Sequence, residues 1–371
     1  MPSEPLHLEV VGELGALSTD WDDVVERMEQ PSPFLRSWWL DGAAAGTPAI
    51  VVVHRGSSLI GGAAFELDRL GRGPITVERV RCLGQGPLAP DHLDVVAAPA
   101  DVADVLDAVL AWLRGSGPRV VDLDGLADGG ALAGSLSDHV ASRTAAPFAS
   151  LTDGIDGYLA GRPGKLRSTI GRTTRRLERE GSTLTTVTGP AASADEADIV
   201  RAEAERALRD LHRLHDQRWS DESGFLDAWD RFVAVATTGI ERGEVRIHEV
   251  TTAGGEVVAT ELDLVLGDVV AFYQAGRRTE REWRGAGTAL RAWILRNAAD
   301  SGAAEYDLLR GDEPYKADWS TGRRDIVRVR LGAGRSGRVV HAAGSAWRRC
   351  APHVHTLAQR LRRGGSGLDA P

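Results

Sequence analysis

The chain has 371 residues, of which 42% are hydrophobic and 26% charged, and this length can supply cores for two ordinary domains. The formal net charge of −9 argues against nonspecific binding of nucleic acid by the molecule as a whole. Two cysteines, Cys82 and Cys350, are too few for a disulfide framework, and with no secretory leader and no apolar run of roughly 18 residues we expect a cytoplasmic protein without a membrane span.

The first half of the chain predicts a hairpin, a helix and a strand, in that order. Apolar runs at 49–54 and 59–67 flank a polar turn that contains glycine, which is the pattern of a hairpin. An apolar stripe at helical spacing covers 102–113 and ends before Gly115, a residue typical of helix C-termini. A strand is expected at 120–123.

The second half repeats this order. Strands are predicted at 245–250, 257–266 and 269–274, the next helix carries an apolar stripe over 290–298, and a further strand is expected at 306–309. Because the two halves share one order of elements, we interpret the chain as a tandem repeat of one α/β fold, although the two sequences are not visibly alike.

Charge is unevenly distributed along the chain. Residues 1–150 contain 10 Arg against 21 Asp and Glu, whereas residues 161–181 contain 7 basic and 2 acidic side chains. This basic run is either a solvated helix face or a surface that handles phosphate. A basic amphipathic helix is expected at 339–363, followed by a flexible tail at 366–371.

A glycine-rich loop stands between a predicted strand and a predicted helix and reads Arg284-Gly285-Ala286-Gly287-Thr288-Ala289. Glycines there let the chain turn tightly, so that amides at the positive end of the helix point outward together and bind an anion, most often a phosphate. The alternative is a turn that only starts a helix. The loop is not a P-loop, because no Lys-Ser/Thr pair follows, and its spacing disfavours a dinucleotide fingerprint.

The pattern Arg-x-x-Gly-x-Ala in this loop resembles the acyl-CoA pyrophosphate motif of the GNAT acetyltransferase superfamily. From Ala271 to Lys316 the chain resembles the CelD/BcsL-like branch of that superfamily, which is related to the Fem peptidyltransferases and has two GNAT-like halves. The resemblance implies an α/β fold class with two tandem GNAT-like domains, each a mixed, mostly antiparallel sheet flanked by helices. It implies a degenerate domain at 1–150, which lacks the motif, and a domain with the acyl-CoA site at 151–365.

The same resemblance implies transfer of an acyl group, which we expect to be acetyl, from acetyl-CoA or another acyl-CoA to an amine. The acceptor is expected to be a small molecule or a cell-envelope precursor, and no metal is expected to take part. In the superfamily the strand before the loop presents backbone amides to the acyl carbonyl and pairs with the pantetheine. Phe272, Tyr273, Gln274 and Ala275 occupy the matching positions, and with the loop at 284–289 they form the predicted cofactor site.

Side chains for acid–base chemistry are predicted near the last strand of the second half. Tyr315 stands where many members of the superfamily place a tyrosine that can protonate the leaving thiolate, and packing is the alternative role. Asp312 and Glu261 are candidates for the base, as are Glu313 and Asp263, because a partly buried carboxylate can gain a pKa suited to deprotonating an amine. Membership of a salt bridge is the alternative for each carboxylate.

Lys316 is notable because Lys316 and Lys165 are the only lysines among 44 basic residues. Resemblance to the Fem-like enzymes implies that Lys316 handles phosphate or developing negative charge at the site, as a compact donor can. An ion pair with Asp312 or Asp318 is the alternative.

Two other functions stay open at this point. A Fem-type ligase with an aminoacyl-tRNA donor is favoured by the basic run and opposed by the acidic first half, and a non-catalytic binding module would have kept the fold without the chemistry. No metal site is predicted, because the histidine pairs His212 with His215 and His353 with His355 lack the cysteine or carboxylate neighbours of a recognised site.

Overall fold

The computed structural model describes residues 4–72, 75–115, 117–219, 224–334, 337–340 and 342. Its strands are β1 Leu6–Val11, β2 Thr47–Arg55, β3 Ser58–Arg72, β4 Ile75–Cys82, β5 Val96–Ala97, β6 Arg119–Ala127, β7 Val140–Ser150, β8 Thr183–Val187, β9 Val245–Thr251, β10 Val257–Leu266, β11 Val269–Arg277, β12 Glu305–Asp307 and β13 Gly322–Ala333. Its α-helices are α1 Ser18–Glu26, α2 Ser37–Ala43, α3 Val102–Arg114, α4 Ala131–Ser135, α5 Gly154–Ala160, α6 Gly164–Arg179, α7 Ala194–Trp219, α8 Trp229–Glu241, α9 Ala286–Asp300 and α10 Pro314–Trp319. The helix predicted at 339–363 lies mostly, and the tail at 366–371 wholly, outside the described residues.

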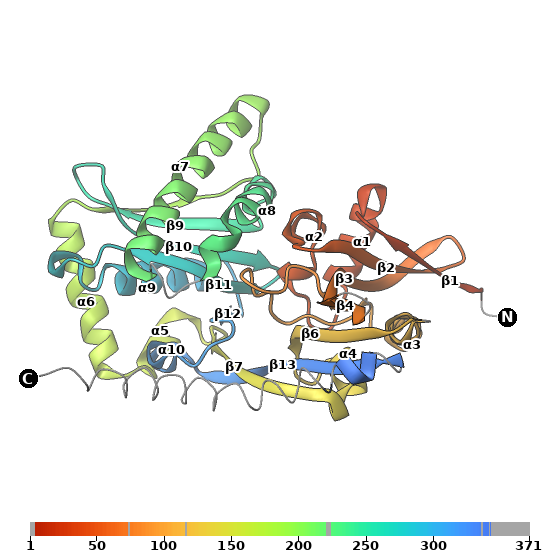
Figure 1. The fold of residues 1–371 in the computed structure, drawn as a ribbon. Helices are drawn as coiled ribbons and strands as arrows, with labels where there is room; N and C mark the ends of the chain where they lie inside the picture. The colour runs from red at the N-terminus through yellow and green to blue at the C-terminus, as the bar shows by residue number, and fades with distance from the viewer. Residues whose placement is uncertain are drawn as a thin grey trace, which may run out of the picture.

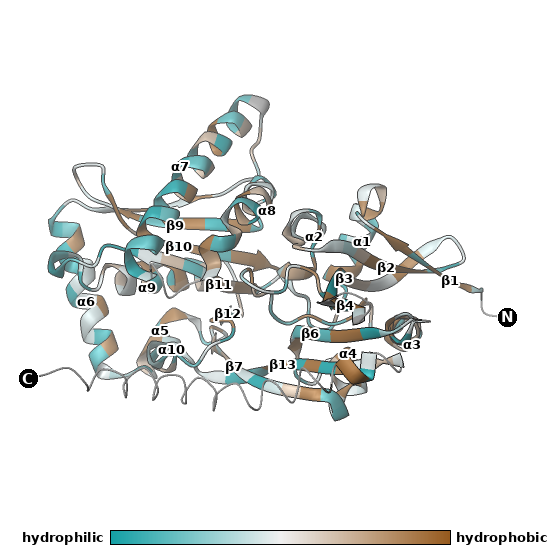
Figure 2. Ribbon diagram, in the orientation of Figure 1, coloured by the Kyte–Doolittle hydropathy of each residue, from teal (hydrophilic) through white to brown (hydrophobic). Residues whose placement is uncertain are grey.

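The described strands form one continuous sheet that runs through the molecule in the order β1-β2-β3-β4-β6-β13-β7-β12-β11-β10-β9-β8, with β5 beside β3 (Figure 1). Two pairs of strands, β4 with β6 and β11 with β12, are parallel, and the other strand pairs are antiparallel. Figure 2 shows hydrophobic residues along the strands and hydrophilic residues recurring on α6 and α7. The predicted α/β class, with a mixed, mostly antiparallel sheet flanked by helices, is confirmed.

The elements predicted in both halves are present. The first-half hairpin is β2 with β3, followed by α3 and β6, and the second half has β9, β10, β11 and α9 in the predicted order. The strand predicted at 306–309 is β12, which begins and ends earlier. It does not extend to Leu309, because Leu309 has a φ of +53°, a left-handed conformation that no strand holds. Strands β1, β4, β5, β7, β8 and β13 are additions to the prediction.

The two halves exchange strands where they meet. β7 belongs to the first half of the sequence but pairs with β12, with Phe148 opposite Asp307. β13 comes last in the chain and lies between β6 and β7. Arg328 and Arg330 of β13 both donate from Nε to Asp122 Oδ1 of β6, at 2.7 and 2.9 Å. Each half therefore completes the sheet of the other, and the domain boundary at residue 150 stays a prediction.

Side chains of β10 point alternately to the two faces of the sheet. Leu262 and Leu264 are buried in a hydrophobic core that also contains residues of α7, α8 and the first half. Glu261 points to the opposite face, where it contacts Arg291 of α9. A second hydrophobic core surrounds α9, and α6 packs against that helix. This layering places α9 and α6 together on the face that carries the glycine-rich loop.

The carboxyl end of the parallel pair in the first half is filled by the chain itself. Leu93, from the segment between β4 and β5, forms a parallel bridge with Leu126 of β6. The Leu93 amide donates to Gly125 O at 2.8 Å, and the Ala127 amide donates to Leu93 O at 3.0 Å. The cavity beside this bridge measures about 10 Å³, which is room for about one water molecule and not for a cofactor.

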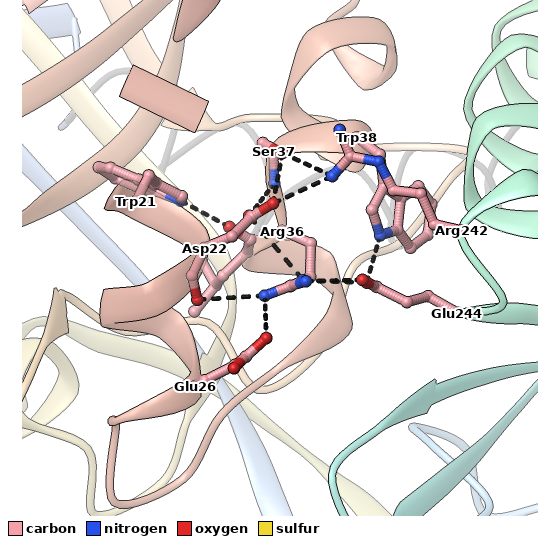
Figure 3. A network of polar contacts seen from close by, with 9 residues as sticks. Trp21, Asp22, Glu26, Arg36, Ser37, Trp38, Arg242 and Glu244 are labelled. Carbon is pink, nitrogen blue, oxygen red and sulfur yellow. Dashed lines mark hydrogen bonds and ion pairs between the residues drawn. The ribbon is translucent and has the colours of Figure 1, made fainter. Parts of the chain in front are cut away.

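A network of polar contacts joins the halves beside α2 and α8 (Figure 3). Arg36 donates to both oxygens of Glu244, with Nη2–Oε1 at 2.6 Å and Nε–Oε2 at 2.9 Å. The indole nitrogen of Trp38 donates to the same carboxylate at 2.7 Å. Arg242 donates to Asp22 Oδ2 at 3.0 Å. Because Asp22 lies in α1 and Glu244 precedes β9, these contacts fix the second half against the first.

Candidate active site

A wedge opens in the sheet of the second half. β11 and β12 pair only over 269–271 and 305–307, so the edge of β11 from Phe272 onward is not paired with β12. On its other edge β11 contains a β-bulge, because Leu262 faces Gln274 whereas Asp263 faces Phe272, which leaves Tyr273 as the extra residue. A bulge locally bends the strand and re-aims its backbone groups. The backbone of β11 is therefore exposed to the wedge and turned out of regular register there.

The first cavity lies between α6, the end of β11, the glycine-rich loop and α10, and has a volume of about 730 Å³. Its walls are strongly basic, and Glu261 is the only acidic residue among the described residues that line it. The cations in its walls are Lys165, Arg172, Arg176, Arg218, Arg277, Arg281, Arg284 and Arg291. Such a concentration of one charge in a concave site attracts an anion.

Most of these cations are available to a ligand. Glu261 is buried and already paired with Arg291, with Nη2–Oε2 at 2.8 Å, and it accepts a hydrogen bond from the Tyr306 hydroxyl at 2.5 Å. Burial raises the pKa of Glu261, and the Arg291 charge opposes that rise. Among the described residues, no carboxylate forms an ion pair with the cations in these walls other than Arg176 and Arg291, which leaves six without one. These are Lys165, Arg172, Arg218, Arg277, Arg281 and Arg284.

The glycine-rich loop forms one end of the first cavity. Gly285, at φ +90°, precedes α9, and the Ala289 amide is bonded to Gly285 O at 2.9 Å. The amides of Ala286, Gly287 and Thr288 precede this bond, so they have no acceptor within the helix. A Cβ at Gly285 would lie 2.7 Å from Thr173 Oγ1, whereas one at Gly287 would meet only Arg277 Cδ, at 3.7 Å. The loop is thus a tight turn with open space in front of its amides, and its first helical turn has no acidic residue.

The predicted loop residues divide into two groups. Arg284, Gly285, Gly287 and Thr288 line the first cavity, and Ala286 and Ala289 are buried behind it, at 0% and 2% exposure.

The second cavity lies between the halves and measures about 610 Å³. The first half contributes residues between Gly86 and Asp91, and the second half contributes the end of α7, the segment Phe272–Ala275 and residues around α10. Arg218, Ala275 and Tyr315 line both cavities. The two cavities therefore meet at the bulged edge of β11.

Two residues with left-handed backbone line the second cavity. Ala89 has φ +43° and Leu309 has φ +53°, and neither is a glycine. Beside them Arg310 donates its amide to Asp91 Oδ2 at 2.8 Å, and its guanidinium is paired with Asp91 and with Asp124. Strained backbone that the surroundings hold in place is concentrated at functional sites, so this wall is a candidate for ligand contact.

Tyr315 lines both cavities and so lies at their junction. Burial raises the pKa of Tyr315, and the nearby Arg291 charge opposes that rise. The Arg291 guanidinium lies 4.1 Å from the ring centre of Phe272 and 5.3 Å from that of Tyr315. The phenol therefore keeps its proton at neutral pH and can donate it.

Lys316 is 4% exposed and lines the second cavity. Its Nζ donates to Arg310 O at 2.6 Å and lies 3.0 Å from Glu313 Oε2. The alternative drawn from the sequence, an ion pair with Asp312 or Asp318, is wrong in its partner, because the carboxylate that pairs with Lys316 is that of Glu313. Burial lowers the pKa of Lys316, and Glu313 opposes that change.

The other predicted side chains lie farther from the junction. Asp312 is exposed and lines a separate surface cavity, which Glu313 and Lys316 also line. Asp263 is 0% exposed and accepts a hydrogen bond from Tyr306 at 3.3 Å. The side chain of Tyr273 points away from the wedge, and its hydroxyl donates to Leu88 O at 2.6 Å. Only the backbone of Tyr273 is therefore in a position to meet a ligand in the wedge.

The sequence analysis did not single out Arg218, Arg291 or Thr173. Arg291 leaves a visible signal, because it is a charged residue next to Leu290 within the apolar stripe of α9. Arg218 and Thr173 leave none, since their place depends on how α7 and α6 pack. Within the described ranges, no group of three His, Cys, Asp or Glu side chains is arranged to hold a metal ion. None of the helices described here has both the length and the apolar character needed to cross a bilayer.

Residues 164–317 match the family of the acetyltransferase (GNAT) domain. This match runs from the start of α6 into α10, and so includes the bulged strand, the glycine-rich loop and Tyr315. No curated protein matches the chain.

Solved structures share the fold over most of the chain. FemX has a TM-score of 0.58 at 10% identity, over 86% of this chain and 96% of FemX. A conserved protein of unknown function from Bacteroides thetaiotaomicron has a TM-score of 0.59 at 10% identity, over 88% of this chain and 100% of that protein. L-PGS from Bacillus licheniformis has a TM-score of 0.53 at 13% identity, over 87% and 94% of the two chains. Residues 164–317 therefore match the acetyltransferase (GNAT) domain, and the chain as a whole has the fold that FemX and these two other solved structures share.

Proposed function

We propose that the chain is an acyl-CoA-dependent N-acyltransferase that transfers an acetyl group to an amine of a small molecule or a cell-envelope precursor. The observation that carries this proposal is the first cavity, in which outward amides and unpaired cations lead to the bulged edge of β11. A cytoplasmic location belongs to the proposal, because acyl-CoA thioesters are available there.

In this proposal the diphosphate of CoA lies against the amides of Gly287 and Thr288, at the positive end of α9. The cations of α6, Arg172 and Arg176, face the same space and would bind the remaining phosphate. The pantetheine would pair with the free edge of β11 and lead the thioester to Ala275. The first half would not bind CoA, since Leu93 bridges Leu126 where the corresponding wedge would open.

The acceptor would enter by the second cavity and meet the thioester at the junction. The amine nitrogen attacks the thioester carbonyl carbon, a C–N bond forms, the C–S bond breaks, and the amine loses one proton while the thiolate gains one. Tyr315 is proposed as the acid that protonates the thiolate. Lys316 is proposed to stabilise negative charge, and Glu261 to take up a proton through the polar groups around it. Asp312, which faces another cavity, is the weaker candidate for the base.

A charged tRNA as the donor is the second candidate. The exposed arginines of α6 and the similarity in fold to FemX favour it. An aminoacyl-tRNA would contact many phosphates, so its binding should weaken steeply as salt concentration rises.

The loop chemistry is tested by Gly287→Glu. Since a Cβ at this position meets only Arg277 Cδ, at 3.7 Å, the variant is expected to fold, and the carboxylate would stand against the phosphates. We expect the affinity for acetyl-CoA, measured by calorimetry, to fall by about 100-fold or more. Gly134→Glu is the matched control, because Gly134 is exposed and a Cβ added there would have no atom within 4 Å. Equal affinities in wild type and Gly287→Glu would refute the proposal.

The nature of the donor is tested by thermal shift of the wild-type chain. Acetyl-CoA, longer acyl-CoAs and charged tRNA are compared, because a ligand that binds only the folded state raises the melting temperature. Stabilisation by charged tRNA alone would favour the second candidate.

A further inference from the structure

Arg218, in the last turn of α7, occupies the point where the two cavities meet. It lines both cavities, as do Ala275 and Tyr315. The glycine-rich loop, in contrast, lines only the first cavity. A group bound by Arg218 is therefore near the reacting end of the ligands, away from the proposed phosphate site.

The charge of Arg218 has no carboxylate partner among the described residues, although its side chain is partly buried. Its guanidinium lies over the ring of Trp219, with the central carbon 4.6 Å from the ring centre. Burial lowers the pKa of Arg218, and the positive charge of Arg277 lowers it further. Glu261, the only acid that the described part of the chain places in the walls of the first cavity, is already held by Arg291 and Tyr306.

Three other arginines that are buried or partly buried have a carboxylate partner. Arg36 is paired with Glu244, Arg291 with Glu261, and Arg310 with Asp91. A partly buried guanidinium without a carboxylate is costly, since its desolvation is not compensated by an opposite charge. The planar fork of arginine is suited to bind a carboxylate through two hydrogen bonds. Arg218, which has no such partner among the described residues, thus points to a partner that arrives with the substrate.

We propose that Arg218 binds a substrate carboxylate that lies a few atoms from the bond formed in the reaction. This inference rests on the acyl transfer proposed above. The second cavity favours the acceptor as its source, because Trp219, Phe225 and Phe272 give that cavity aromatic walls around the Arg218 charge. The acceptor is then an amino acid or a short peptide, whose carboxylate Arg218 holds while its amine faces Ala275. A dicarboxylic acyl group on the donor would present the same chemistry.

The test compares ligands that carry the carboxylate with ligands that lack it. Amino acids and dipeptides are compared with their C-terminal amides as acceptors, and acetyl-CoA is compared with succinyl-CoA as donor, by calorimetric binding and by CoA release. Arg218→Gln is measured beside Arg209→Gln, an exposed arginine of the same helix that lines neither cavity. Arg218→Lys keeps the charge without the planar fork and should recover only part of the effect.

We expect the wild type to prefer the carboxylate-bearing acceptor, and Arg218→Gln to lose about 30-fold in kcat/KM for that acceptor alone. Its kcat/KM for the amide and its affinity for acetyl-CoA should change less than about twofold. If the lost preference is instead for succinyl-CoA, the carboxylate comes from the donor.

Three results would overturn the inference: no carboxylate preference in the wild type, an unchanged preference in Arg218→Gln, or an equal loss for all ligands. Failure of the acyltransferase proposal has a different signature. In that case acyl-CoA does not bind, while the carboxylate ligands still bind in a way that depends on Arg218.

Discussion

Lys316 has a buried charge, and its contacts fit either a catalytic role or a structural role. Its ammonium bonds to Arg310 O and is paired with Glu313, at the wall of the second cavity. If Lys316 stabilises charge that develops in the reaction, Lys316→Met should lower kcat by about 100-fold. The affinity for acetyl-CoA should change by less than about twofold, because Lys316 does not line the first cavity. Steady-state kinetics and calorimetry on the same preparation measure both quantities.

Glu313→Gln is the control for this prediction. It removes the ion pair and leaves the bond from Lys316 to the Arg310 carbonyl in place. A catalytic Lys316 should tolerate this change far better than its own removal. Equal losses of turnover and of acetyl-CoA affinity in Lys316→Met would instead show that Lys316 holds the left-handed segment at Leu309.

At the scale of elements, the prediction concerns the two faces of α6. Arg172 and Arg175 are both exposed arginines of this helix, but only Arg172 lines the first cavity. With an acyl-CoA donor, Arg172→Gln should weaken acetyl-CoA binding by about 5- to 10-fold, because one charged hydrogen bond to phosphate is lost. Arg175→Gln should bind acetyl-CoA as the wild type does. Calorimetry at two salt concentrations measures this difference.

The opposite pattern would favour the alternative donor. A tRNA covers the whole basic face, so both substitutions should then lower the salt dependence of binding by similar amounts.

The loop at 284–289 could be predicted from the sequence because every part of it is local. Glycine freedom, the start of a helix and the positive helix end are set by neighbouring residues. β13 could not be placed in the same way. Its Arg-Val alternation is visible in the sequence, but the pairing of Arg328 with Asp122 joins residues 206 positions apart. Arg218 was missed for the same reason, since its neighbours come from β11, α9 and α10.

At the scale of the whole molecule, the first half explains why the chain is a tandem. The segment that carries Leu93 fills the wedge of the first half, and the same segment, at Gly86–Asp91, forms a wall of the second cavity. The half without a glycine-rich loop thus shapes the site of the other half. The polar network at Arg36 and Glu244 keeps this wall in position.

The strand exchange yields the last prediction. A fragment that starts at residue 151 lacks β6 and β7, so β12 loses one of its two neighbours and β13 loses both of its neighbours. Unpaired edges and lost core contacts should leave this fragment without a cooperative thermal transition. Expression together with residues 1–150 should restore the transition and acetyl-CoA binding, because β7 and β6 are supplied again. A fragment that melts cooperatively on its own and binds acetyl-CoA with the affinity of the full chain would mean that the second half is an independent domain, and that the exchanged strands contribute little to its stability.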